Sequence, residues 1–203
     1  MVDVNQISQL LKTHFWITKG KVQIDPDTGV VNVEGSVRLK HSLSQLPVTF
    51  GEVWGYFDCA RKSLTTLQGA PRLVGGNFLC ESNKLTHLQG SPDHVIGDFF
   101  CDHNQLTSLH GACPRVDATF LCNDNPLTSL EGAPEHVGDA FVVDYSAHLP
   151  LLRLLMYKEV ELDAESPPEI QDLLNKYAGE GKKGAIKCAA ELVKAGFREN
   201  ARW

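Results

Sequence analysis

The sequence of 203 residues has no apolar run long enough to cross a membrane, and its N-terminus lacks the apolar core of a secretory signal peptide. We therefore expect a cytoplasmic protein. It also has no Cys-x-x-Cys pair and no Cys/His spacing typical of zinc, so we expect neither a metal nor a cofactor. The segment Gly179–Gly184 is not a phosphate loop, because no strand precedes it and the final Gly-Lys-Ser/Thr is missing.

What the sequence does contain is one 21-residue unit, repeated five times without insertion or deletion between residues 43 and 148. A fixed period of this length is typical of solenoids, and 21 residues fit one coil of a leucine-rich repeat. Apolar residues recur in strict columns along the copies, which begin at Leu43, Leu64, Leu85, Leu106 and Leu127. The columns are Leu46, Leu67, Leu88, Leu109 and Leu130; Val53, Val74, Val95, Val116 and Val137; Phe57, Phe78, Phe99, Phe120 and Phe141; and Cys59, Cys80, Cys101 and Cys122, with Val143 in the fifth copy.

The segment Phe-x-Cys-x-x-Asn-x-Leu stands where a leucine-rich repeat has Leu-x-Leu-x-x-Asn-x-Leu. This pattern predicts one short strand per coil, with Phe and Cys pointing inward, and a parallel sheet along the concave face. Gly and Pro would turn the chain on an irregular convex side. We expect the asparagines at the bend (Asn83, Asn104 and Asn125) to satisfy backbone groups that the turn leaves unpaired.

The flanks of the repeats predict a cap at each end. Residues 1–42 contain a helix over 3–13 with Asp3 at its N-cap, a hairpin of 22–24 with 30–33, and a degenerate first coil over 22–42. Residues 149–203 predict a short helix over 149–157, a strand over 160–162, and helices over 169–178 and 183–195 that end before Gly196. Each of the last two helices has an apolar stripe with amphipathic spacing. The stripes are Ile170, Leu173, Leu174 and Tyr177, and Ile186, Ala189, Ala190 and Val193.

Three stretches together resemble a known family. They are the repeats, L-T-S-L-x-G-A-P-x-x-V-x-G-x-F-x-C-x-x-N, the preceding V-x-V-x-G-x-V-x-L, and the tail KYAGEGKKGAIKCAAELVKAGF over 176–197. They resemble the leucine-rich-repeat proteins encoded by tailed bacteriophages, over roughly residues 22–203. The resemblance implies a leucine-rich-repeat fold and a viral origin, without a biochemical activity. More loosely, the repeats are similar to those of the secreted ubiquitin ligases of enteric pathogens, whose separate catalytic domain has no counterpart here.

The cysteines are predicted to be structural. The ladder from Cys59 to Cys122 fills an inward column that takes Val143 in the fifth copy, so a small buried side chain suffices there. We expect reduced thiols in a cytoplasmic protein, and Cys188 is expected to pack within an Ala-rich helix. Cys113, three residues after His110, is the one candidate for a Cys–His nucleophile. No third residue would orient the pair, and a turn on the outer surface is a poor pocket, so the sequence favours a protein that is not an enzyme.

Residues that alternate with Phe and Cys must point outward, and they form the candidate binding surface. Its middle column is apolar in four consecutive coils, and the column past Cys is largely acidic. Contiguous exposed apolar residues usually mark interaction sites, and solenoids bind through such faces. The middle column is Asp58, Leu79, Phe100, Leu121 and Val142; the next is Ala60, Glu81, Asp102, Asn123 and Asp144; the column before Phe is Tyr56, Asn77, Asp98, Thr119 and Ala140.

Charge is unevenly distributed, with a net −7 over residues 43–148 and +4 over residues 173–203. The apolar and acidic columns suggest an interaction module whose protein partner has a basic and apolar surface, and the resemblance to bacteriophage proteins implies that this partner is a host factor. The predicted contact residues are Tyr56, Asp58, Leu79, Glu81, Asp98, Phe100, Asp102, Leu121, Asn123, Val142 and Asp144. Alternatives are a small ligand in the concave groove, an enzyme that uses Cys113, nucleic acid on the basic C-terminal helices, which the sequence disfavours, or a stripe covered by residues 149–203.

Overall fold

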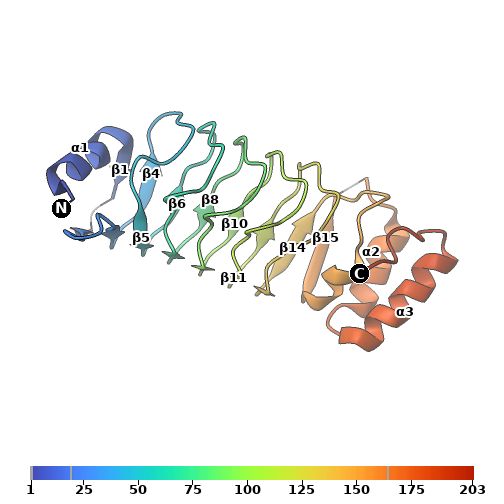
Figure 1. Ribbon diagram of the computed structural model, residues 1–203. Coiled ribbons are helices and arrows are strands. Elements are labelled where there is room, and N and C mark those ends of the chain that lie inside the picture. Colours follow the sequence, from blue (N-terminus) through green and yellow to red (C-terminus); the bar gives the residue numbers. More distant parts are fainter. Residues whose placement is uncertain (1, 19, 164) are drawn as a thin grey trace.

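The computed structural model describes residues 2–18, 20–163 and 165–203. They form a parallel β-solenoid of about six turns with helices at its C-terminal end. The coils lie side by side in an elongated row, with helix α1 at one end and helices α2 and α3 at the other (Figure 1). The predicted solenoid of stacked coils is therefore confirmed. No helix in these described ranges is long and apolar enough to span a membrane.

The N-terminal cap has the predicted helix and hairpin. Helix α1 (Val4–His14) begins after Asp3, whose Oδ1 accepts hydrogen bonds from the first turn. Strands β2 (Val22–Ile24) and β3 (Val31–Val33) pair antiparallel, and β3 and β4 (Val37–Leu39) belong to the first coil. Strand β1 (Phe15–Ile17), which the sequence analysis did not predict, pairs antiparallel with β4. It covers a strand edge that would otherwise be open to pairing with other chains.

Each repeat coil contains two short strands, so the prediction of one strand and an irregular convex side is wrong. The strands build a seven-stranded sheet and an eight-stranded sheet that run along the solenoid. The first strands of the coils are β5 (Phe50–Val53), β7 (Leu73–Val74), β9 (His94–Val95), β11 (Arg115–Val116) and β13 (His136–Val137). The second strands are β6 (Phe57–Asp58), β8 (Phe78–Leu79), β10 (Phe99–Phe100), β12 (Phe120–Leu121) and β14 (Ala140–Val143).

The second sheet forms because the valine column pairs with itself from coil to coil. Val74, Val95 and Val116 are in register and fully buried, as suits β-branched side chains on a packed strand. The chain then turns a tight corner toward the Phe strand, with the backbone against the preceding coil. At the Gly138 corner, an added Cβ would lie 2.0 Å from the Asp117 carbonyl oxygen, so only glycine fits. The corner lets both strands face one core.

The phenylalanine column is the centre of that core. The five phenylalanines of this column have 0% exposure, as predicted for inward residues; they are Phe57, Phe78, Phe99, Phe120 and Phe141. Their rings stack along the solenoid with centroids 5.0 to 5.7 Å apart. Phe15 and Phe50 extend the stack at the N-terminal end, and Tyr157 closes it at the other end, 4.6 Å from Phe141. The core is therefore one continuous column of aromatic contacts rather than separate clusters.

The asparagine column ties neighbouring coils together, as expected from its place at the bend. Asn104 Oδ1 accepts from the Leu85 backbone N–H at 3.1 Å, and Nδ2 donates to the carbonyls of Cys80 and Cys101, both at 3.1 Å. Asn83 and Asn125 repeat this arrangement one coil away. The residues just before the three asparagines (Ser82, His103 and Asp124) have left-handed φ values of 56°, 52° and 53°. The sequence analysis did not foresee this conformation.

The C-terminal module packs on the last coil. The helix predicted over 149–157 is a shorter 3₁₀ helix, η1 (Leu152–Met156), and β15 (Glu159–Leu162) joins the eight-stranded sheet as its final parallel strand. Helices α2 (Pro168–Tyr177) and α3 (Gly181–Lys194) follow. Gly196, just past the C-cap Ala195 of α3, has a φ of 98°, the left-handed conformation that stops a helix. Asn200 is 1% exposed and donates to the carbonyls of Ser146 and Leu149. The end of the chain is thus attached to the solenoid.

The two C-terminal helices differ in how well their apolar stripes predicted burial. The α2 stripe packs inward, with Ile170, Leu174 and Tyr177 buried. The α3 stripe does not, because Ile186 is 72% exposed and Val193 is 42% exposed. Helix α3 instead buries Gly184, Ala185, Cys188 and Leu192. The prediction that the Ile186 stripe is the packed face is therefore wrong. The helix has apolar residues on two sides, and the small side packs closely against α2 and η1.

Candidate protein-binding face

The outer side of the eight-stranded sheet carries a continuous row with one residue from each strand. Strand pairing places every member directly beside the next. Its four central residues are apolar, and we call them the apolar row: Leu79, Phe100, Leu121 and Val142. The whole row is Trp16, Arg38, Asp58, Leu79, Phe100, Leu121, Val142 and Glu161. Trp16 was missed because β1 was not predicted, and Glu161 was missed because the pairing of β15 was not predicted. Arg38 lies in the predicted first coil, whose outward residues were not included in the candidate site.

The apolar row is half-buried rather than fully exposed. Neighbouring strands lie about 4.8 Å apart, so each side chain covers part of the next one. Phe99 and Phe100 illustrate the strand alternation, since Phe99 has 0% exposure and Phe100 lies at the surface. The result is an apolar strip across four coils, with the stacked phenylalanines on its inner side.

The C-terminal module does not cover the apolar row in the part of the chain that the structure describes. Helix α2 contacts β15 and η1, and α3 contacts η1 and α2. Both helices lie beyond the last coil (Figure 1). At the other end of the row, Arg38 Nε is 3.0 Å from Asp58 Oδ2, and the Arg38 guanidinium carbon is 5.9 Å from the centre of the Trp16 ring. The negative charge of Asp58 is therefore already paired.

A row of acidic side chains borders the apolar row on the side past the cysteines, and we call it the acidic row: Glu81, Asp102 and Asp144, with Asn123 between the last two. Burial raises the pKa of Glu81, and the carboxylates of Asp102 and Asp58 add to the rise. Burial likewise raises the pKa of Asp144, helped by Asp124 and Asp163. Their ionised forms are thus destabilised by lost hydration and mutual repulsion, which a cationic partner would relieve.

His103 lies within the acidic row and was not a predicted site residue. Its Nδ1 is 2.9 Å from Asp102 Oδ2 and 3.4 Å from Asp124 Oδ2. The hydrogen bond to Asp102 and the surrounding carboxylates raise the pKa of His103. The signal available in the sequence was its position beside Asp102, but the left-handed backbone at His103 decides that the ring turns toward the carboxylates. The histidine gives this row a partial positive charge that depends on pH.

Two predicted site residues, Tyr56 and Asp98, lie in the column before the phenylalanines. Tyr56 is 40% exposed. Asp98 Oδ1 accepts from the Thr119 backbone N–H at 3.1 Å, and Asp98 Oδ2 accepts from Asn77 Nδ2 at 3.2 Å. These hydrogen bonds join three coils at the corner between the sheets. The Asp98 carboxylate therefore serves the fold, and it is less available to a partner than the carboxylates of the acidic row.

The cysteines have the environment of core residues. All six are buried free thiols, and Cys101 Sγ lies 3.2 Å from the Leu121 carbonyl of the next coil. Cys113 is fully buried, and burial raises its pKa to about 12, which disfavours the thiolate. Its thiol donates to the Arg115 carbonyl at 3.0 Å, whereas His110 is exposed and its ring contacts Gln89. The candidate Cys–His pair is therefore not assembled as a nucleophile and base.

Neither the acidic row nor any other place in the described ranges gathers three His, Cys, Asp or Glu residues in a geometry that could hold a metal ion. Hollows of 310 and 400 Å³ lie at the two ends of the molecule. The first is formed by η1, α3 and Trp203, and the second by α1, β1 and β2, so neither is lined by the apolar row.

Compared with models of known families, with curated proteins and with solved structures, the chain gives no significant match.

Proposed function

We propose that this chain is a non-enzymatic protein-interaction module of the leucine-rich-repeat type. Its partner is a protein with a basic and apolar surface, which docks on the outer side of the eight-stranded sheet. The observation that supports this most directly is the in-register apolar row from Leu79 to Val142 beside the acidic row. The resemblance to bacteriophage proteins makes a protein of the host cytoplasm the expected partner.

The leucine-rich-repeat assignment is supported by the inward Phe–Cys pair and by the asparagine column. Asn104 bonds backbone groups of two coils, which is the part that the asparagine of the repeat template is expected to play. The second sheet through the valines departs from the simple template. The core is thus enclosed between two sheets, which should hold the outer side of the eight-stranded sheet rigid. A rigid surface loses little conformational entropy when it binds a partner.

The apolar row lines neither the 310 Å³ hollow nor the 400 Å³ hollow, which favours a macromolecule over a small ligand as its partner. Small molecules bind in concave pockets that bury most of their surface, whereas protein interfaces combine an apolar centre with a polar rim. Phe100, with Leu79 and Leu121 on either side, has the aromatic character and central position of an interface anchor. Glu81 and Asp102 at the rim would attract a basic partner and repel phosphate backbones.

Nucleic acid is not proposed for the basic C-terminal helices, because several of their cations are already paired. Lys176 Nζ is 2.9 Å from Glu191 Oε2, and Lys187 Nζ is 3.4 Å from Glu180 Oε2. Phosphate contacts require cations that are free to displace counterions, and these pairs reduce that number.

The test is a comparison of purified, tagged variants as bait in extract of the host cell. Phe100→Ser should reduce capture of a specific protein, and direct titration of that protein should show an affinity at least about tenfold weaker. Ile96→Ser is the matched control, because Ile96 is 42% exposed on the same coil but outside the apolar row. Asp102→Asn should mainly slow association and flatten its salt dependence. Equal binding by the Phe100 and Ile96 variants would refute the proposed face.

A further inference from the structure

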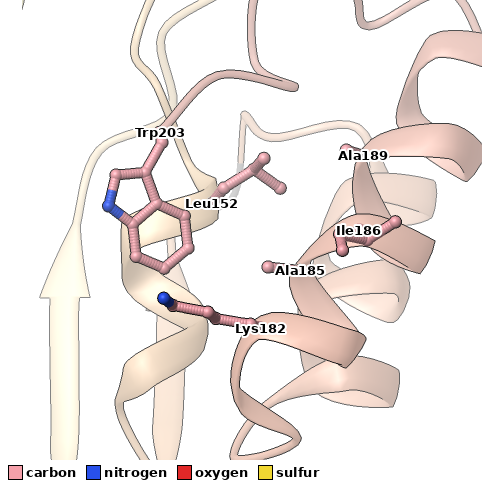
Figure 2. A pocket seen from close by; sticks show the side chains of 6 residues that line it. All are labelled: Leu152, Lys182, Ala185, Ile186, Ala189 and Trp203. Carbon is pink, nitrogen blue, oxygen red and sulfur yellow. The ribbon is translucent and has the colours of Figure 1, made fainter.

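Helix α3 presents an apolar face that nothing covers among the described residues. Among the side chains that the structure describes, Ile186 and Trp203 are the two most exposed large apolar ones, with 72% and 65% exposure, and Val193 follows one helical heptad after Ile186. Ile186 and Trp203 line opposite sides of the 310 Å³ hollow, whose floor includes Leu152 and whose edge carries Lys182 (Figure 2). Large exposed apolar patches on a small protein usually mark a contact with another molecule.

The same face is basic. Lys183 and Lys194 are exposed on α3 next to the Ile186–Val193 stripe, as is Lys187, whose Nζ is also 3.4 Å from Glu180 Oε2. Residues 173–203 carry a net +4. The face therefore combines apolar anchors with cations. This chemistry complements the apolar row and the acidic row of the eight-stranded sheet. Both rows belong to the repeats, which as a whole (residues 43–148) carry a net −7.

We propose that a second copy of this chain binds there, with the α3 face of one copy docked on the eight-stranded sheet of the other. Ile186 and Val193 contact the apolar row, and the lysines of α3 lie over the acidic row. This proposal rests on the proposed function in one respect, because it uses the same protein-binding face and names an occupant for it. It adds self-association, through which the copies can mask the face from other partners.

The spacings of the two faces agree. Seven residues along a helix span about 10.5 Å, and two strand spacings span about 9.6 Å. With α3 parallel to the row, Ile186 and Val193 therefore lie over side chains two coils apart, such as Leu79 and Leu121. Eleven residues, from Lys183 to Lys194, span about 16.5 Å, against about 14.4 Å for the three coil steps from Glu81 to Asp144. The cations and carboxylates can meet at both ends of the contact.

The contact must form between copies rather than within one. Helix α3 is fixed beyond the last coil by Ala185, Cys188 and Leu192, which are buried, and its contacts are with α2 and η1. The two complementary faces are thus different patches of the same molecule. Such an interface is heterologous. Copies joined head to tail form a ring if the rotation between them closes, and an open chain of copies if it does not.

The contact is small, since one helix face meets one strip of sheet. Interfaces below the standard size form weak, transient assemblies. We therefore expect a dissociation constant on the order of tens of micromolar, so that copies are separate when dilute and associated when concentrated. High salt should weaken the contact without abolishing it, because the screened charges leave the apolar anchors in place.

Sedimentation velocity of the full chain between about 2 and 200 µM tests the proposal, in a range that brackets the expected dissociation constant. The weight-average mass of the wild-type chain should rise with concentration. Phe100→Ser removes one face and Ile186→Gln removes the other, so each variant alone should stay monomeric. A mixture of the two variants should form pairs, because each supplies the face that the other lacks, and should not grow further. Ile96→Ser should associate like the wild-type chain. Circular dichroism and thermal melting confirm that every variant is folded.

A wild-type chain that stays monomeric at about 200 µM would overturn the proposal. So would association that survives Phe100→Ser or Ile186→Gln, or a mixture of the two variants that stays monomeric. The proposed function has a separate outcome. A chain that stays monomeric but still captures a foreign protein through Phe100 would refute only the proposed self-association. A chain that neither associates nor captures a foreign protein would refute both the self-association and the proposed function.

Discussion

An apolar pattern in the sequence predicted which side chains are buried in the repeat coils, but it did not do so in helix α3. In the coils, strand alternation placed Phe99 inside and Phe100 outside, as predicted. In α3, the stripe with amphipathic spacing lies at the surface, and Ile186 is 72% exposed. A coil is packed between near-copies of itself, so its own sequence specifies its neighbours. A helix with two apolar sides has no such internal reference, and its tertiary partners decide which side is buried.

The largest effect should separate Phe99 from its outward neighbour. Phe99→Ala removes a ring stacked between Phe78 and Phe120, at 5.0 and 5.2 Å, and should lower the free energy of unfolding by about 3–5 kcal/mol. Phe100→Ser should cost less than about 1 kcal/mol, because the side chain lies on the outer side of the sheet. Urea denaturation measures both. Similar losses for the two variants would mean that the outward side is covered.

The same contrast applies within α3. Leu192→Ala should cost about 2–5 kcal/mol, since Leu192 has 0% exposure and lies on the buried side of α3. Ile186→Gln should change the free energy of unfolding by less than about 0.5 kcal/mol at low protein concentration, because glutamine is a good helix former and the site is exposed. Thermal melting at a few micromolar protein tests the pair, and a large loss for Ile186→Gln would contradict the surface position of the stripe.

The buried asparagines between the coils should contribute strongly to the stability of the fold. Asn104→Ala leaves the Leu85 N–H and the Cys80 and Cys101 carbonyls without their side-chain partner, which should cost about 2–4 kcal/mol. Asn123→Ala is the matched control, since the Asn123 side chain bonds only the Asp124 carboxylate at the surface. We expect the control to stay within about 0.5 kcal/mol of wild type in chemical denaturation. Equal losses would mean that the bend does not depend on the buried amide.

The smallest expected change in stability comes from removing a carboxylate of the acidic row. The pKa of Glu81 is raised in the folded protein, so ionisation above the ordinary glutamate range costs stability as the pH rises. Glu81→Gln should therefore melt at a higher temperature than wild type at pH 7. The gain in free energy of unfolding should be less than about 1 kcal/mol, because the side chain is half exposed. The difference should vanish at about pH 3, well below the pKa of an ordinary glutamate, where the wild-type side chain is protonated in both states. Glu135→Gln, at an exposed turn, controls for net charge, and an advantage that persists at low pH would reject the explanation.

Much of the candidate site could be predicted because it follows from repeat register. Once the repeat was aligned, the alternation of Phe99, Phe100 and Cys101 gave the outward columns directly. The pairing partners at the two ends could not be predicted. Trp16 and Glu161 extend the row only because β1 and β15 pair with the sheet, and neither strand has the repeat pattern. The interaction of His103 with Asp102 likewise depends on a left-handed backbone that no residue type at that position requires.

The sequence by itself determined the solenoid, its inward columns and the asparagine bonds between coils, because each coil must satisfy the coil beside it and that coil has nearly the same residues. The tertiary structure alone decided the second sheet and the orientation of α3. The valine strands exist because a tight corner brings each of them against its copy one coil away. Helix α3 turned its small residues inward because Ala185 and Cys188 allow a closer approach to the neighbouring helices than Ile186 would. That choice left the larger apolar face at the surface.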